Sequence, residues 1–360
     1  MGTVEVDRRR IRQPYFSVCI PQYNRTSFLI ESCKMLARQS FRDFEVCISD
    51  DCSTDGREQE LLQFLDTTGL SYMYARQDRN RRYDANLRAS IALASGEYCF
   101  LLGNDDRLVS ASTLEEVWRE ISGRGSPAVA LTNYQDAVTG RTFRRVRSSG
   151  VLSGTPALAA TLFRNLSFVS GVVVEATLAK HHATTRWDGS EMYQMYLGSR
   201  LIAAGGSALA IDRVAVWKGL QVSGEQVDSY ASAPALPAWP IVERRLPLIQ
   251  IVRLVADAIA PYTDLRQRKY LVERIALQVL MFTYPFWIIE YRRVQSWAYA
   301  VGVCLGMRPG NILEGLAVSR VTRARVLGAY TLSTLGGLMI PVSVFSALEP
   351  VLYGVAKLRR

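Results

Sequence analysis

The sequence FSVCIPQYNR, residues 16–25, begins as an apolar run of the length of a buried strand and ends in polar residues. Runs of the same kind recur along the chain, separated by segments of helical length. The predicted strands are Phe16–Ile20, Phe44–Ser49, Tyr72–Ala75, Tyr98–Leu102 and Ala128–Thr132. This alternation predicts an α/β fold with a mostly parallel sheet flanked by helices. Ligands of such sheets bind beyond the carboxyl ends of the strands.

Polar and acidic residues follow three of the predicted strands. The first strand is followed by PQYNR (21–25), the second by DDCSTDG (50–56) and the fourth by GNDD (103–106). Carboxylates after neighbouring strands would repel one another unless a cation or hydrogen-bond donors lay between them. The arrangement therefore suits a nucleotide diphosphate, with a divalent ion on Asp106 beside Asp105 and with Asp51 facing the base or ribose. Asp50 and Asp55 are expected to form turns and helix caps.

Four ordered segments resemble the signatures of family 2 glycosyltransferases: CIPQYNR (19–25), ISDDCSTDG (48–56), ASGEY (94–98) and LGNDDRL (102–108). The segment NRRYDAN (80–86) is also similar to a stretch of the abequosyltransferase-like O-antigen enzymes, which place an Asp and an Asn there. The resemblance implies a GT-A fold, which is Rossmann-like, a nucleotide-sugar donor, a Mg or Mn ion and inversion at the anomeric carbon.

The resemblance also implies roles for individual residues. Asp51 would contact the nucleoside, Pro21 and Tyr23 would line its pocket, and Asp106 would bind the metal together with Asp105. The remaining candidate donor-binding residues are Asn24, Arg25, Asp84 and Asn86. Many relatives have an Asp where Gly103 stands in this chain, so the acidic cluster is smaller here.

Transfer with inversion needs a base that takes the proton from the acceptor hydroxyl. The candidate lies in RWDGSEMY, residues 186–193. Relatives carry an acidic residue near the start of a helix at about this place, which favours Glu191, with Asp188 as the alternative. A Glu in the first turn of a helix is also stabilised by the helix dipole alone, so a purely structural role competes with catalysis.

Charge and composition divide the chain. Its 360 residues have a formal net charge of +10, and residues 241–360 hold 16 Lys or Arg against 7 Asp or Glu. The predicted parts are a flexible basic tail (1–14), a catalytic domain (15–230), a Pro-rich linker (231–240) and a helical region (241–360). Within the catalytic domain, residues 15–132 would bind the nucleotide sugar and residues 133–230 the acceptor.

The helical region 241–360 combines basic residues with apolar runs, which suits an anionic membrane surface better than nucleic acid. Val326–Leu348 has 23 uncharged residues, enough to cross a bilayer, but Pro341 and basic flanks on both sides favour a re-entrant or in-plane helix pair. The aromatic residues expected at the interface are Trp287, Trp297, Tyr299 and Tyr330. A helical bundle that forms a homo-oligomer is the alternative.

The charged start of the chain lacks an apolar core of signal-peptide length, so the expected location is the cytoplasmic face of the inner or plasma membrane. The leading hypothesis is a hexosyl- or deoxyhexosyltransferase that acts on a lipid-linked (polyprenyl diphosphate) saccharide in cell-surface, O-antigen-like polysaccharide biosynthesis. A first alternative transfers the sugar directly to a polyprenyl phosphate. A second, of another class, is a non-catalytic membrane-bound scaffold with a degenerate GT-A domain.

Overall fold

The structure is a computed structural model of the chain and describes residues 4–6, 13–223 and 247–345. The chain forms two compact units. The first comprises Met1–Leu158 and Leu162–Ala231, and the second comprises Ala159–Thr161 and Ser232–Arg360. The predicted linker, residues 231–240, lies outside the described residues.

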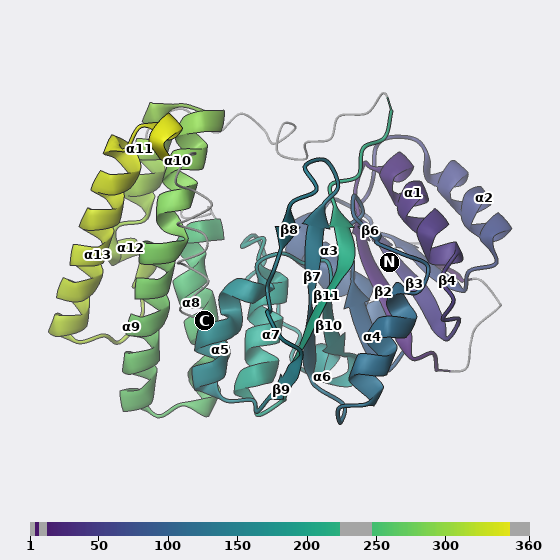
Figure 1. Cartoon of the computed structure of the whole chain (residues 1–360), viewed down its shortest axis with the longest axis horizontal. Helices are drawn as coiled ribbons and strands as arrows, with labels where there is room; N and C mark the ends of the chain where they lie inside the picture. The colour runs from purple at the N-terminus through teal and green to yellow at the C-terminus, as the bar shows by residue number, and fades with distance from the viewer. Residues whose placement is uncertain (1–3, 7–12, 224–246, 346–360) are drawn as a thin grey trace. The chain divides into compact units, whose positions relative to one another are not determined.

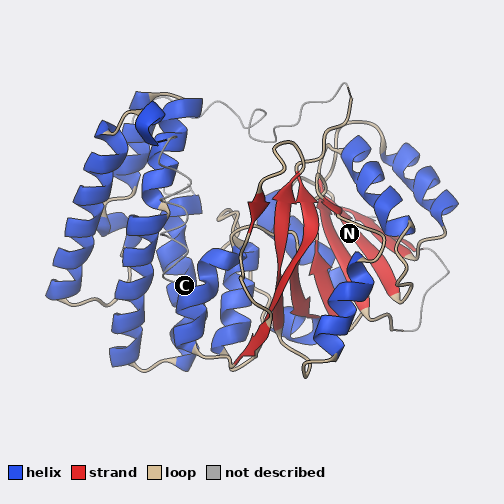
Figure 2. Ribbon diagram, viewed as in Figure 1, coloured by secondary structure: helices blue, strands red, loops and turns tan. Residues whose placement is uncertain are grey.

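The first unit is built on one mixed sheet with helices on both of its faces (Figures 1 and 2). The strands are β1 (Val4–Val6), β2 (Phe16–Gln22), β3 (Phe44–Asp50), β4 (Tyr72–Arg76), β5 (Tyr98–Leu101), β6 (Arg107–Leu108), β7 (Val129–Asp136), β8 (Thr142–Phe143), β9 (Gly150–Leu152), β10 (Val172–Glu175) and β11 (Ala208–Lys218). The helices up to residue 203 are α1 (Thr26–Ala37), α2 (Glu58–Thr68), α3 (Arg82–Leu93), α4 (Thr113–Ser122), α5 (Pro156–Leu162), α6 (Ala176–His181) and α7 (Tyr193–Ala203), with a 3-10 helix, η1 (Phe163–Leu166), before β10.

The order of the strands is β1-β4-β3-β2-β5-β10-β7-β11-β6, with β8 on β7 and β9 on β11. β4, β3, β2 and β5 are parallel, as predicted. Beyond β5 the sheet is mixed, because β10 runs antiparallel to both of its neighbours. Residues 4–6, which lie within the predicted tail, form β1, which pairs antiparallel with β4 at the edge of the sheet.

The two faces of the central strands carry different side chains. In β2, Phe16, Val18 and Ile20 join a large apolar core with residues of α1, α2 and α4. Because side chains alternate along a strand, Ser17 and Cys19 lie on the opposite face, which α3 covers. Small side chains on this face allow α3 to pack closely on the ends of β2 and β3, where the polar loops begin.

The segment 94–98 supports the fold rather than the site. The Glu45 carboxylate is buried and accepts hydrogen bonds from the Ser17 hydroxyl (2.6 Å), the Ser95 backbone N–H (2.6 Å) and the Ser95 hydroxyl (2.9 Å). Gly96 donates its backbone N–H to the Ser17 oxygen at 2.9 Å, and a Cβ at Gly96 would lie 2.8 Å from that atom. Glycine is therefore needed at this close approach of two strands.

The second unit is helical, as predicted. Its helices are α8 (Pro247–Ile259), α9 (Leu265–Phe282), α10 (Tyr284–Val294), α11 (Trp297–Gly306), α12 (Pro309–Ile312) and α13 (Arg320–Met339), with a 3-10 helix, η2 (Ala260–Tyr262), after α8. Side-chain caps start three of them: Asp264 accepts from the Gln267 N–H, Ser296 from the Tyr299 N–H and Ser319 from the Thr322 N–H.

The apolar run that begins at Val326 is interrupted at Pro341, where the sequence predicted a break. Helix α13 ends at Met339, and residues 346–348 of the run lie outside the described residues. The aromatic side chains of the second unit differ from the prediction. Tyr299 is buried, and the Tyr330 hydroxyl donates to the Cys304 carbonyl at 2.9 Å, so neither faces outward as expected at an interface. Within the described residues, one helical stretch, Leu265–Val294, is long and apolar enough to cross a membrane by length and composition.

Candidate active site

Gln22, the last residue of β2, connects the loops that follow three strands. Its carbonyl accepts hydrogen bonds from the Asp51 N–H (2.9 Å) and from Asn86 Nδ2 (2.9 Å), and its Oε1 accepts from Asn104 Nδ2 (2.8 Å). These partners follow β3, lie in α3 and follow β5, respectively. Gln22 was not among the predicted site residues, although a fully buried amide at the end of an apolar strand is unusual.

Two buried polar atoms at this junction have no hydrogen-bond partner within the described part of the chain. They are Gln22 Nε2, a donor, and Asn86 Oδ1, an acceptor. An unpaired buried polar atom costs free energy, and a polar ligand or ordered water normally satisfies it. The junction therefore offers one donor and one acceptor to a polar ligand.

Asp51 lies directly after β3 and is buried. One of its carboxylate oxygens accepts the Arg81 N–H at 2.7 Å, which ties the loop before α3 to the end of β3. Burial raises the pKa of Asp51, and the hydrogen bond from Arg81 opposes this effect. Of the two predicted pocket residues at the end of β2, Pro21 is buried in the ladder, whereas Tyr23 is 41% exposed.

Asp50 and Asp55 stabilise turns, as predicted. Asp50 accepts the Ser53 N–H at 2.7 Å, inside its own loop. Asp55 accepts both the N–H (3.3 Å) and the hydroxyl (2.8 Å) of Thr26, the first residue of α1. The loop after β3 therefore caps the helix that follows β2.

Asn24 and Arg25 connect the loop after β2 to its two neighbours. Asn24 has a left-handed backbone conformation, with φ of 48°, and its Oδ1 accepts the Thr54 N–H at 2.6 Å. The Arg25 guanidinium forms an ion pair with Asp105 after β5. Both residues were predicted to bind the donor, and in the structure they hold the loops of the site together.

Asp106 is almost completely buried. The Ser170 hydroxyl donates to one of its oxygens, and the Gly219 N–H donates to the other at 2.9 Å. Ser170 Oγ also accepts the Gly103 N–H at 2.8 Å. Burial, followed by the charge of Asp105, raises the pKa of Asp106 to about 7, and the two hydrogen bonds oppose this shift.

A buried guanidinium, that of Arg145, lies near this cluster. It donates to the carbonyls of Phe168 (2.8 Å) and Ser170 (2.7 Å) and lies over the rings of Tyr134 and Phe168. Burial lowers the pKa of Arg145 to about 10, and the negative charge of Asp106 opposes this shift. This role could not be predicted, because Arg145 stands in a basic run, RRVR (144–147), that is typical of an exposed loop.

The acidic pair offers part of a metal site. Among the described residues, no group of three or more His, Cys, Asp or Glu side chains is placed to hold a metal ion. Mg²⁺ and similar ions often use one or two carboxylates and take their other ligands from phosphate and water. Asp105 and Asp106 fit an ion of this kind, although Asp105 also pairs with Arg25.

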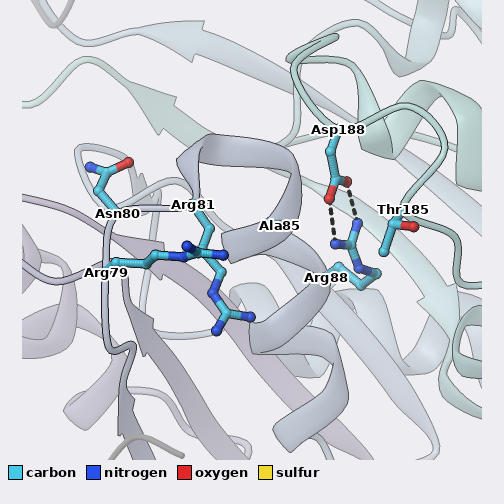
Figure 3. A pocket seen from close by; sticks show the side chains of 7 residues that line it. All are labelled: Arg79, Asn80, Arg81, Ala85, Arg88, Thr185 and Asp188. Atoms are coloured by element: carbon cyan, nitrogen blue, oxygen red, sulfur yellow. Dashed lines mark hydrogen bonds and ion pairs between the residues drawn. The ribbon is translucent and has the colours of Figure 1, made fainter.

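The two candidate bases lie in very different surroundings. Both oxygens of Asp188 accept hydrogen bonds from the Arg88 guanidinium, at 2.5 and 2.8 Å (Figure 3). Glu191 is exposed, and within the described chain no hydrogen bond to its carboxylate is found. The neighbouring protein nevertheless removes part of the water around the Glu191 carboxylate, which raises its pKa, whereas the charge of Arg82 lowers it.

Asp84, predicted to contact the donor, is directed elsewhere. Its carboxylate accepts the backbone N–H groups of Gly189 (2.9 Å), Glu191 (2.8 Å) and Tyr193 (2.9 Å). The first turn of α3 therefore holds the segment that carries the candidate base.

A cavity of about 480 Å³ adjoins this segment. It lies between the loop before α3, α3 itself and the segment before α7 (Figure 3). Its lining is Arg79, Asn80, Arg81, Ala85, Arg88, Thr185 and Asp188. Arg88 pairs with Asp188 and Arg81 with Asp78, and the net positive charge of the lining suits an anionic group such as a phosphate.

Fold and site together define a GT-A type α/β domain with acidic residues after β3 and β5, the two strands that flank β2. The crystal structure of Staphylococcus aureus TarS 1–349 in complex with UDP-GlcNAc has a TM-score of 0.59 and 17% identity, over 89% of this chain and 90% of that one. At this identity the similarity concerns the fold alone.

Residues 17–173 match the model of Glycosyl transferase family 2. The abequosyltransferase RfbV of Salmonella typhimurium is 40% identical over 98 residues, 27% of this chain and 29% of that protein. The GalNAc(5)-diNAcBac-PP-undecaprenol beta-1,3-glucosyltransferase of Campylobacter jejuni is 28% identical over 99 residues, 28% of this chain and 32% of that protein. The chain thus spans about a third or less of these two relatives, and the predicted family resemblance is confirmed.

The acidic cluster leaves no room for a side chain at residue 103. A Cβ there would lie 2.9 Å from Asp106 Oδ2 and 3.3 Å from Asp105 Oδ1. We predict that Gly103→Ala and Gly103→Asp each lower the free energy of unfolding by about 1–3 kcal/mol, because Asp106 must leave its hydrogen bonds. Urea denaturation measures the effect. Gly150→Ala is the control, since nothing lies within 4 Å of its Cβ position, and equal stability of all three variants would contradict the prediction.

Proposed function

We propose that the protein is an inverting glycosyltransferase that moves a hexosyl or deoxyhexosyl group from a nucleotide sugar to a lipid-linked saccharide during cell-surface polysaccharide biosynthesis. The observation that carries the proposal is a match to the family 2 model in a domain whose acidic residues follow β3 and β5, the two strands that flank β2. Gln22 and Arg25, at the end of β2, join them. Parallel strands that end side by side create the crevice in which nucleotides bind in such sheets.

The nucleotide sugar would bind over this junction. Asp51 would accept hydrogen bonds from the base or ribose, as the family resemblance implies. Gln22 Nε2 and Asn86 Oδ1 offer one unused donor and one unused acceptor nearby, which supports a polar ligand. The similarity of fold to TarS, which was crystallised with UDP-GlcNAc, supports a donor of this class.

Asp106 and Asp105 would hold a Mg or Mn ion, which would neutralise negative charge on the diphosphate leaving group when bound. Ser170 and the Gly219 N–H fix the orientation of Asp106. Arg25 pairs with Asp105 and would supply a permanent positive charge next to the leaving group.

Glu191 would act as the general base toward the acceptor hydroxyl. A base needs a carboxylate that is free to meet the acceptor, and Glu191 fits this requirement better than Asp188, which Arg88 engages through both oxygens. A raised pKa also makes Glu191 a stronger proton acceptor than an ordinary glutamate.

A lipid-linked acceptor has a charged diphosphate, which a basic cavity could bind, and a lipid chain, which stays in the membrane. The arginine-rich cavity beside Asp188 suits the diphosphate of such an acceptor. The Campylobacter jejuni relative, by its name, acts on a PP-undecaprenol saccharide. Activity at the cytoplasmic face of the membrane would bring the domain to an acceptor of this kind.

Helix α13 provides a surface for this membrane contact. Val321 (60%), Leu332 (64%), Leu335 (53%) and Met339 (74%) are exposed, and their spacing places them on one face of the helix. Arg320, Arg323 and Arg325, all exposed, lie in its first two turns. An apolar stripe with basic residues at one end is typical of a helix that lies in the interface of an anionic membrane.

We predict that Asp106→Asn abolishes sugar transfer and the stabilisation of the protein by nucleoside diphosphate with Mn²⁺. A thermal-shift panel of nucleotide sugars and nucleoside diphosphates, with and without Mn²⁺, measures binding and names the donor. Asp43→Asn, at the opposite end of β3, is the matched control and is expected to bind and transfer normally. The scaffold hypothesis predicts no Mn²⁺-dependent binding by the unmodified protein, and full turnover by Asp106→Asn would exclude the metal role.

We predict that Glu191→Ala lowers kcat by about 100- to 10,000-fold with a saccharide acceptor, because the hydroxyl then lacks a base. Nucleotide binding should stay unchanged in the thermal-shift assay. A polyprenyl phosphate is already an anion and needs no base, so an unaffected Glu191→Ala enzyme would favour that alternative acceptor.

We predict that Leu332→Glu with Leu335→Glu prevents flotation of the protein with vesicles that contain phosphatidylglycerol. The unmodified chain should float with these vesicles, less with neutral phosphatidylcholine and less at high salt. Val138→Glu, which changes another exposed apolar residue, is the control. If the double variant changed only the size measured by chromatography and still floated, α13 would be an oligomer contact instead.

A further inference from the structure

Asp84 of α3 holds the segment before α7 through hydrogen bonds to three backbone N–H groups, a contact that we call the clamp. The family resemblance does not imply this contact. Asp84 is 1% exposed and accepts three backbone N–H groups from residues 189–193, which follow it by more than 100 positions. A carboxylate is the side chain suited to this task, because its two oxygens can accept several hydrogen bonds and donate none.

The clamped segment has an unusual backbone. Gly189 has φ of 91° and Glu191 has φ of 57°, both in the left-handed region. For a residue other than glycine this conformation costs of order 1 kcal/mol or more and persists only where surrounding contacts enforce it. The contact from the Glu191 N–H to Asp84 Oδ2, at 2.8 Å, is such a contact at the residue itself.

Asp84 also completes the start of α7. The first N–H groups of a helix lack partners within the helix, and the residue before α7, Met192, provides no side-chain cap. The Tyr193 N–H donates to Asp84 Oδ1 at 2.9 Å instead. One buried carboxylate therefore fixes both the turn that contains Glu191 and the helix that follows it.

A second contact from α3 supports the same segment. Arg88, one turn after Asp84, donates to both oxygens of Asp188 (Figure 3). It also donates to the Thr184 carbonyl at 2.9 Å, and its guanidinium lies over the Tyr193 ring. The start of α3 is also tied to the donor side, because the Arg81 N–H donates to Asp51. A continuous set of contacts thus leads from Asp51 to Glu191.

We infer that Asp84 is a positioning residue for transfer: it holds Glu191 in the left-handed turn that directs its carboxylate toward the acceptor. This inference rests on the proposed function, since it assigns Asp84 a role only if Glu191 acts as the base. It also replaces the expectation that Asp84 contacts the donor.

The test is a double-mutant cycle of Asp84→Asn and Glu191→Gln. Asn keeps the size of Asp84, but whichever way its amide lies, an NH₂ group faces at least one of the three N–H donors. We expect Asp84→Asn to lower kcat by about 10- to 100-fold and to leave the KM for the nucleotide sugar within about twofold. In the Glu191→Gln background the same change should have no further effect, because Asp84 acts through Glu191. If the double variant lost kcat by the product of the two single losses, the inference would be overturned.

A matched control separates positioning from general stability. Glu175 caps α6 by accepting the N–H groups of Thr177 (3.1 Å) and Leu178 (2.5 Å), and Glu175→Gln should lower the melting temperature without lowering kcat. If Asp84→Asn does not fold, Arg88→Lys, which loses the two-point contact with Asp188, should show the same pattern with a smaller loss.

Hydrogen exchange provides a measurement that does not depend on activity. The amides of Gly189, Glu191 and Tyr193 should exchange faster in Asp84→Asn than in the unmodified chain or in Glu175→Gln. Unchanged exchange would show that the clamp does not hold the segment. The two claims can fail separately. If no nucleotide sugar supports transfer by the unmodified chain, the proposed function fails. Faster amide exchange in Asp84→Asn would still show that Asp84 holds the segment before α7.

Discussion

The structure depends on how three buried carboxylates are satisfied. Asp51, Asp84 and Asp106 are each nearly inaccessible to solvent, and removing a charged group from water is costly unless hydrogen bonds replace the water. Each accepts backbone N–H groups from a segment far along the chain: the loop before α3, the segment before α7 and the residue after β11. The loops of the site therefore take their positions together, because none of these three carboxylates is satisfied by its own loop alone.

This dependence explains what the sequence predicted and what it did not. The central strands and the acidic residues after them follow from local patterns, namely short apolar runs that end in Asp-rich turns. Their partners are mostly backbone N–H groups, which every residue except proline has and which leave no mark in a sequence. Glu191 and Asp188 could be proposed from their position before a helix, but the sequence could not distinguish a carboxylate held by Arg88 from one that is exposed.

Residues at the centre of the site were missed for the same reason. Ser170 and Arg145 contact Asp106 or its neighbours only because β10 lies beside β5 and β7, an antiparallel insertion that the parallel pattern did not predict. In the second unit the helices were predictable, but the directions of their aromatic side chains were not. Tyr299 and Tyr330 lie on helices with apolar residues on several faces, so periodicity alone could not tell an inward face from an outward one.

The clamp of Asp84 also has a cost that follows from its burial. Burial raises the pKa of Asp84 to about 6, against the three N–H groups that oppose the shift. In the unfolded chain an aspartate ionises near pH 4, so folding loses free energy as the pH rises from about 4 to 6, and above that the loss is constant at roughly 3 kcal/mol. A neutral residue would avoid this loss but could not accept all three N–H groups. Stability is thus given up where the backbone of Glu191 must be held, which is expected at a site where geometry matters more than stability.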